Sequence, residues 1–227
     1  MSGILYLVAT PIGNDDDMTI RALKTLQSAD VIVCEERKEG ERLLAKYKIA
    51  EKAVETLNEH NESAAAFHIL EHLKAGRNVA LISDAGTPVF SDPGQFLVRK
   101  AIASDIPIVP VPGASSLLPA LTVSGFPIEQ FVFCGFLSPK SNRRIAELRQ
   151  LRNERRTLVL MDAPYRLLPL LRDVADILGG ERRICVAFNL TMSDETVFRG
   201  TASELHRIFE RKNLKGEFVV IVEGRGD

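Results

Sequence analysis

The chain has 227 residues, of which 45% are hydrophobic and 26% are charged, with a formal net charge of −1. This composition excludes a disordered chain, and the near-neutral charge excludes a protein whose whole surface is basic, but it allows a local basic patch. No apolar stretch reaches the about 18 residues of a membrane span, the N-terminus lacks a signal peptide's basic region and the three cysteines lack C-x-x-C spacing, so we expect a reduced, cytoplasmic protein.

Strands and helices alternate at short intervals through the first half of the chain. Apolar runs and helical spacing of apolar residues distinguish the two kinds of element. The predicted strands span residues 4–9, 30–34, 55–57, 79–82 and 106–111. The predicted helices span residues 18–27, 42–47, 63–75 and 95–103. This order is typical of a mostly parallel sheet, in which the loops after the strands gather at one edge.

The second half alternates in the same way, with more hairpin-like connections. The predicted strands span residues 131–136, 157–161, 183–188, 196–200 and 218–222. The predicted helices span residues 117–124, 142–154, 167–178 and 202–212. We place the domain boundary near the connector that follows the helix 117–124, and expect an N-terminal α/β domain of residues 1–116 and a C-terminal α/β domain of residues 117–227. A cleft between the two domains is the natural ligand site.

The loop from Ser83 to Gly94 directly follows the buried strand 79–82. Ligands bind beyond the carboxyl ends of strands in open α/β sheets. Gly86 lets backbone approach a ligand closely, and Asp84 and Thr87 offer polar partners. Taken alone, this pattern fits a binding loop and a well-capped turn before the next helix equally well.

Several standard sites are absent from the sequence. There is no G-x-x-x-x-G-K-[ST], no G-x-G-x-x-G after the first strand and no G-x-S-x-G, which disfavours a P-loop nucleotidase, a Rossmann dinucleotide site and a hydrolase nucleophile elbow. His68 and His72 are four residues apart on a predicted helix, as in some metal sites. No third ligand of suitable spacing is apparent, so we interpret them as surface histidines and expect no metal.

Two charged segments have both a functional and a structural interpretation. Glu35 and Glu36 end a strand and are candidates for general acid–base chemistry, although solvated loop charge explains them as well. The segment 140–156 carries seven basic residues against Glu147 and Glu154. It is either a phosphate-binding surface or one face of a solvated amphipathic helix.

Several loop motifs, taken together and in order, resemble those of a known family. They are Val8-Ala9-Thr10-Pro11-Ile12-Gly13-Asn14, Ser83-Asp84-Ala85-Gly86-Thr87-Pro88, Ser91-Asp92-Pro93-Gly94 and Val111-Pro112-Gly113-Ala114-Ser115, with Leu57-Asn58-Glu59-His60-Asn61-Glu62, Gly135-Phe136-Leu137, Arg199-Gly200-Thr201 and Gly216-Glu217-Phe218. These motifs are similar to those of the 16S ribosomal RNA cytidine 2′-O-methyltransferase branch of the tetrapyrrole methylase superfamily, across almost the whole chain.

The resemblance implies two α/β domains of tetrapyrrole methylase type, a homodimer, and S-adenosylmethionine bound in the cleft between the domains. The implied substrate is a cytidine ribose of 16S ribosomal RNA in the small ribosomal subunit. By the same resemblance, the cofactor-binding residues are Pro11, Ser83, Asp84, Ala85, Gly86, Thr87, Phe90, Ser115, Ser116, Met161, Asn189, Leu190, Thr191, Gly216 and Glu217. A poorly nucleophilic ribose hydroxyl needs a nearby base, for which Glu35 and Glu36 are our candidates, and the basic segment becomes an RNA surface with Lys140, Arg143 and Arg144 as candidate contacts.

Three segments depart from the family pattern, at residues 34–38, 162–166 and 188–192, and we expect no extension after the last strand. The departures leave two alternatives open. One is a methyltransferase of the same superfamily that acts on a tetrapyrrole or another small molecule. The other is a non-catalytic relative that binds the cofactor or the ribosome.

Overall fold

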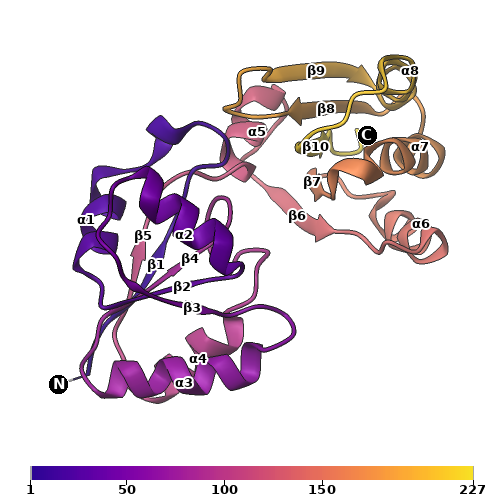
Figure 1. The fold of residues 1–227 in the computed structure, drawn as a ribbon. Helices are drawn as coiled ribbons and strands as arrows, with labels where there is room; N and C mark the ends of the chain where they lie inside the picture. Colours follow the sequence, from indigo (N-terminus) through magenta and orange to yellow (C-terminus); the bar gives the residue numbers. More distant parts are fainter. Residues whose placement is uncertain (1, 227) are drawn as a thin grey trace. The chain divides into compact units, whose positions relative to one another are not determined.

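The computed structural model describes residues 2–226, which form two compact units. The first unit ends at Ser115 and the second begins at Ser116. Each unit is an α/β layer structure with its own five-stranded sheet, as Figure 1 shows for each separately. The predicted α/β fold class is confirmed. None of the helices among the described residues is long and apolar enough to cross a membrane.

The sheet of the first unit is entirely parallel. Its strands are β1 (Leu5–Val8), β2 (Val31–Cys34), β3 (Ala53–Thr56), β4 (Val79–Ile82) and β5 (Ile108–Val111), in the order β3-β2-β4-β1-β5. Every residue of β2 and β4 is buried, which is why these strands are continuous apolar runs. The carboxyl ends of all five strands therefore lie at one edge.

Helices cover both faces of this first sheet (Figure 1). The helical segments are η1 (Asp15–Asp17), α1 (Ile20–Ser28), α2 (Arg37–Lys46), α3 (Glu62–Lys74) and α4 (Gln95–Ala103). One core contains Ala22, Leu26 and Leu44 from α1 and α2. The other contains Leu70 and Leu97 from α3 and α4.

The sequence leaves residues 35–39 either as a charged loop or as the start of the helix that continues over 42–47, and the structure has the helix start. Helix α2 begins at Arg37, and its first turn packs through Gly40 and not through an apolar side chain. An added Cβ at Gly40 would lie 2.6 Å from the Sγ of Cys34, so α2 approaches β2 too closely for any side chain there. Helical spacing of apolar residues cannot reveal such a contact.

The second unit has a mixed sheet. Its strands are β6 (Phe131–Phe136), β7 (Thr157–Met161), β8 (Arg183–Phe188), β9 (Thr196–Thr201) and β10 (Phe218–Val222), in the order β6-β7-β10-β8-β9. Only β6 and β7 pair in parallel, and the other three pairs are antiparallel.

One face of the second sheet carries the large apolar core of the unit. Its helical segments are α5 (Leu117–Ser124), α6 (Ser141–Leu151), η2 (Pro164–Arg166), α7 (Leu167–Leu178) and α8 (Ala202–Lys212). Side chains of α6, α7 and α8, such as Leu148, Leu171 and Phe209, pack on this face. Helix α5 contacts β8, β9 and β10.

Candidate functional site

The loops after β1 and β4 are joined by a short two-stranded bridge in the first unit. The backbone N–H of Thr10 donates to the carbonyl of Gly86 (2.9 Å), and the N–H of Gly86 donates back to the carbonyl of Thr10 (3.1 Å). The buried hydroxyl of Thr10 also donates to the carbonyl of Ser83 (3.0 Å). These bonds hold the predicted cofactor loop at the carboxyl edge of the sheet.

Glycine is required at the centre of this loop. Gly86 has φ of +84°, and a Cβ there would lie 3.3 Å from Cγ2 of Ile12. Val89, a β-branched residue, has φ of +70°. Non-glycine residues in this region carry strain, and such strain is concentrated at ligand sites. The geometry thus favours the binding-loop interpretation over that of an ordinary turn.

Thr10 and Glu62 support the loop in ways that the sequence analysis missed. One carboxylate oxygen of Glu62 accepts from the N–H groups of Gly94 (2.8 Å) and Phe96 (3.2 Å), and so fixes the end of the loop to the start of α4. Thr10 and Glu62 both lie inside motifs that carry the family resemblance, which was the available signal. The partners of Thr10 are 73 or more residues away along the chain, and those of Glu62 are 32 or more residues away.

Carboxylates are crowded at the same edge. Partial burial raises the pKa of Glu35, and the negative charges of Asp84 and Asp92 raise it further. The pKa of Asp84 is also raised, first by burial, although the backbone N–H of Glu36 opposes the shift. The side chains of Glu35 and Asp84 therefore share a region of negative potential, where a cationic group is stabilised.

A pocket of about 160 Å³ lies beside this edge, under α2. Its lining includes Pro11, Ser83 and Asp84 from the predicted site. On the helix side, the ammonium of Lys46 lies 2.5 Å from a carboxylate oxygen of Asp15. The pocket brings the loops after β1 and β4 together around a polar space.

The remaining predicted residues of the first unit and the junction lie on the same loops. Ala85, Thr87 and Phe90 are exposed, and the hydroxyl of Thr87 donates to the carbonyl of Ala114 (3.4 Å). Ser115 and Ser116 are half-buried, and Ser116 directly precedes α5. Glu36 is exposed, in contrast to the half-buried Glu35.

The candidate residues of the second unit gather at the edge where β7 and β8 end and β10 begins. They are Met161, Asn189, Leu190, Thr191, Gly216 and Glu217. Asn189 and Thr191 have φ of +48° and +67°, and the N–H of Asn189 donates to the carbonyl of Glu217 (2.8 Å). Two positive φ values at non-glycine residues within three positions indicate that this loop is strained as well.

Asn189 presents a buried acceptor at this edge. Its amide nitrogen donates to Asp194 (2.7 Å), whereas its Oδ1 is buried and has no hydrogen-bond partner among the described residues. A Cβ at Gly216 would overlap the Asn189 side chain and lie 2.7 Å from Cζ of Phe188. A buried polar atom without a partner costs free energy, so a ligand that donates to it, such as an amine, gains correspondingly.

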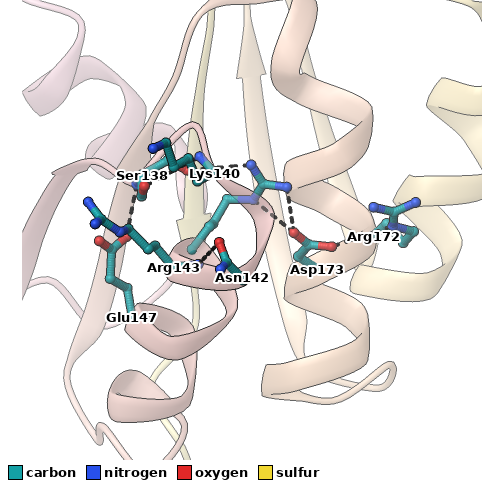
Figure 2. Close-up of polar contacts among 8 residues, drawn as sticks. Ser138, Lys140, Asn142, Arg143, Glu147, Arg172 and Asp173 are labelled. Atoms are coloured by element: carbon teal, nitrogen blue, oxygen red, sulfur yellow. Dashed lines mark hydrogen bonds and ion pairs between the residues drawn. The ribbon is translucent and has the colours of Figure 1, made fainter.

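Arg144 was expected on an RNA-binding surface, and the structure places it elsewhere. Its side chain is 4% exposed, and its guanidinium contacts the buried carboxylate of Asp173 at 2.7 and 2.8 Å. Figure 2 shows Asp173 in this contact, with Arg172 on its other side. Arg144 therefore joins α6 to α7, because removing both charges from water together is possible only when they pair.

Lys140 and Arg143 are exposed at the start of α6 (Figure 2). The backbone N–H of Lys140 donates to the hydroxyl of Ser138 (3.3 Å), and that of Arg143 to Oδ1 of Asn142 (2.9 Å). Glu147 accepts from the N–H of Ser138 (2.8 Å) and so steadies the turn before the helix. Both basic side chains are accessible to a ligand.

His72 is not the surface histidine that the sequence suggested. Its side chain is 17% exposed, and its Nε2 lies 2.6 Å from a carboxylate oxygen of Glu55 on β3, with His68 Nε2 3.5 Å from the same oxygen. Glu55 thus supplies the third group that spacing alone did not reveal. Arg77 lies 3.0 Å from Nδ1 of His72, and because a guanidinium only donates, Nδ1 accepts while Nε2 faces Glu55.

Comparison with known proteins identifies the family of this chain. A model of the family described as Tetrapyrrole (Corrin/Porphyrin) Methylases matches residues 4–206. Proteins named ribosomal RNA small subunit methyltransferase I from Synechocystis sp. and Thermotoga maritima are each 44% identical to this chain. Both alignments cover 98% of this chain, and they cover 79% and 99% of the respective relatives.

Solved structures show the same fold at lower identity. Uroporphyrin-III-C-methyltransferase from Thermus thermophilus matches with a TM-score of 0.67 and 21% identity, covering 97% of this chain and 94% of that one. A cobalt precorrin-4 methyltransferase matches with a TM-score of 0.68 and 18% identity over the same shares. From the family model and the relatives that align over nearly the whole chain, we conclude that the chain belongs to the tetrapyrrole (corrin/porphyrin) methylase family and is a methyltransferase.

Proposed function

We propose that this protein is an S-adenosylmethionine-dependent methyltransferase that methylates the ribose 2′-hydroxyl of a cytidine in 16S ribosomal RNA. The observation that carries the proposal is the 44% identity, over nearly the whole chain, to proteins named ribosomal RNA small subunit methyltransferase I. We further propose that it acts in the cytoplasm as a homodimer.

The residues at the two sheet edges fit such a cofactor. S-adenosylmethionine, when bound, supplies a methyl group that is already activated by a sulfonium. The carboxylates of Asp84 and Glu35 favour a cation nearby. The buried Oδ1 of Asn189 suits an amine donor such as that of adenine. Glycine at positions 86 and 216 keeps both loops closely packed, because a Cβ there would meet Ile12 or Asn189.

Glu35 is our candidate for the base. A ribose hydroxyl is a poor nucleophile while it carries its proton, so a carboxylate within reach assists transfer of a methyl to its oxygen. In this step the oxygen–carbon bond would form as the carbon–sulfur bond of the bound donor breaks, so that a neutral thioether leaves, and the Glu35 carboxylate would receive the hydroxyl proton. The raised pKa of Glu35 makes it a stronger base than an exposed glutamate, whereas Glu36 is exposed and serves the role less well.

Lys140 and Arg143 are the proposed contacts to RNA. Both lie at the N-terminal end of α6, next to the end of β6, and β6 runs parallel to β7, whose end carries Met161. The exposed cations therefore lie at the same edge of the second sheet as the candidate cofactor residues of that unit. Phosphate contacts position a substrate without reading its sequence.

The decisive experiment measures ribose methylation of small-subunit RNA by mass spectrometry, with purified protein and S-adenosylmethionine. We expect one cytidine to gain a 2′-O-methyl group, and no gain with a Gly86→Val variant. Methylation of a tetrapyrrole but not of RNA would replace the proposed substrate with the small-molecule alternative. Cofactor binding without transfer to RNA or to any component of a cell extract would instead indicate a non-catalytic relative.

A further inference from the structure

A second basic surface lies at the opposite edge of the second sheet. There β6, β7 and β8 begin and β10 ends, away from the edge that carries Met161 and Asn189. A cavity of about 640 Å³ opens at this edge. Its lining includes Arg155, Arg156 and Arg225, and we call it the arginine pocket.

Backbone contacts hold the arginine pocket in shape. The N–H of Arg225 donates to the carbonyl of Glu154 (2.7 Å), and the N–H of Glu223 donates to the carbonyl of Arg183 (3.0 Å). A Cβ at Gly224 would overlap the carbonyl of Arg155. The segment after β10 is thus fixed against the turn before β7, and the backbone of Arg225 is held in a defined position.

Positive charge exceeds negative charge around the pocket. Glu154 accepts two bonds from the guanidinium of Arg156, at 2.9 and 2.8 Å. Glu223 lies 3.9 Å from Arg183. Arg182 and Arg225 instead donate to neutral oxygens, the carbonyl of Arg152 and the amide of Asn153.

The pKa of Arg182 reflects this excess of positive charge. Burial lowers its pKa, and the positive charge of Arg225 lowers it further, although Glu223 opposes the shift. The Nε of Arg182 is buried and has no hydrogen-bond partner among residues 2–226. An anion at this position would relieve the repulsion between the two guanidinium groups.

A buried aromatic ring supports Arg183, the neighbour of Glu223. The guanidinium of Arg183 lies over the ring of Phe126, 5.6 Å from its centroid, and the Arg183 side chain is 66% exposed. Arginine is the residue best suited to phosphate, because its planar fork of donors matches two phosphate oxygens at once.

From the pocket, its fixed backbone and its excess of arginine, we infer that the arginine pocket binds the phosphate backbone of the RNA substrate, at a point separate from Lys140 and Arg143. This inference rests on the proposed RNA substrate. It divides the basic segment 140–156 into two contacts at opposite edges of one sheet, with Arg144 buried between them.

The test uses the full chain and measures affinity for small-subunit RNA at several salt concentrations. We expect an Arg155→Gln/Arg225→Gln double variant to bind RNA roughly tenfold more weakly, with a salt dependence shallower by about one for each lost phosphate contact. Arg21→Gln removes one exposed cation from α1 and serves as the control. Arg155→Lys/Arg225→Lys should recover part of the affinity, because the charge is kept.

The outcomes separate this inference from the proposed function. If the glutamine double variant binds RNA as tightly as the control, with the same salt dependence, the pocket is not an RNA contact, while the proposed function stands. If the unaltered protein binds no RNA, both fail. If inorganic phosphate displaces RNA far better than chloride at equal ionic strength, the pocket is a small-anion site and the inference fails. Unchanged calorimetric binding of S-adenosylmethionine would show that the weaker RNA affinity does not reflect unfolding.

Discussion

Gly86 is the position at which an added side chain should most directly disturb the proposed cofactor site. A Gly86→Val variant places a β-branched side chain at φ of +84° and against Ile12. We expect affinity for S-adenosylmethionine to fall at least about a hundredfold, or roughly 2.8 kcal/mol, as measured by titration calorimetry.

A matched control exists in the second unit. Gly125 has φ of +78°, nearly the same as Gly86, but an added Cβ there meets nothing within 4 Å. Gly125→Val therefore introduces the same backbone strain without entering the loop, and it should bind cofactor normally. If Gly86→Val bound the cofactor as normally as Gly125→Val, the loop after β4 would not be the cofactor site.

Glu35 allows a test of the proposed base. Glu35→Gln keeps the size of the side chain and removes the proton acceptor, so we expect kcat to fall about a hundredfold or more while cofactor affinity is retained. In the unaltered protein, activity should rise with pH through the raised pKa of Glu35, because the carboxyl must lose its proton before it can accept another. Retention of the same rise in Glu35→Gln would assign the base to another group.

A variant at Asp92 tests independently whether Glu35 is the proposed base. The charge of Asp92 raises the pKa of Glu35. Asp92→Asn should therefore lower that pKa and move the rising limb of the pH–rate profile to lower pH. Asp176→Asn, on the exposed face of α7, should leave the profile where it is. A shift to higher pH in Asp92→Asn would contradict the assignment of the limb to Glu35.

At the scale of elements, the contact between α6 and α7 depends on one buried ion pair. Arg144→Ala leaves the carboxylate of Asp173 buried without its main partner, and breaking such a pair costs about 3–5 kcal/mol. We expect that loss in urea denaturation. Arg143→Ala, at the exposed neighbouring position, should change stability by less than about 0.5 kcal/mol. Similar values for the two variants would mean that Arg144 is accessible to water.

Strands were predicted more accurately than the contacts between elements, for a physical reason. A strand buried on both faces, such as β4, must be apolar at every position, so its sequence alone identifies it. Arg144 and the exposed Arg143 are adjacent and have nearly the same sequence neighbours. Only Asp173, 29 residues later on another helix, distinguishes them. Gly40 and Glu55 likewise take their roles from partners that lie on other elements.

The candidate site was predictable to a similar, limited degree. The loop motifs predicted segments of the proposed site that contain Gly86 and Gly216, whereas Asn189 lies in the segment 188–192, which departs from the family pattern. The positive φ of Asn189 and its buried Oδ1 were not predictable. They follow from the hydrogen bond between Asn189 and the carbonyl of Glu217, a pairing made by two strands that are distant in the chain.

At the scale of the whole molecule, the proposal requires residues of both units to bind one cofactor. A ligand that binds only the folded state stabilises it by about 2.7 kcal/mol at a hundredfold excess over Kd, and thermal unfolding reports this gain. We expect Gly216→Ala, whose new Cβ would overlap the side chain of Asn189, to lose the thermal shift that S-adenosylmethionine produces.

The comparison between variants decides whether one unit suffices. Gly86→Val alters the first unit and Gly216→Ala the second, so loss of the shift in both means that the cofactor needs both sets of loops. Gly226→Ala adds the same methyl group where nothing lies within 4 Å, and it should keep the shift. If Gly216→Ala also kept it while Gly86→Val did not, cofactor binding would belong to the first unit, and the buried acceptor of Asn189 would need a different ligand.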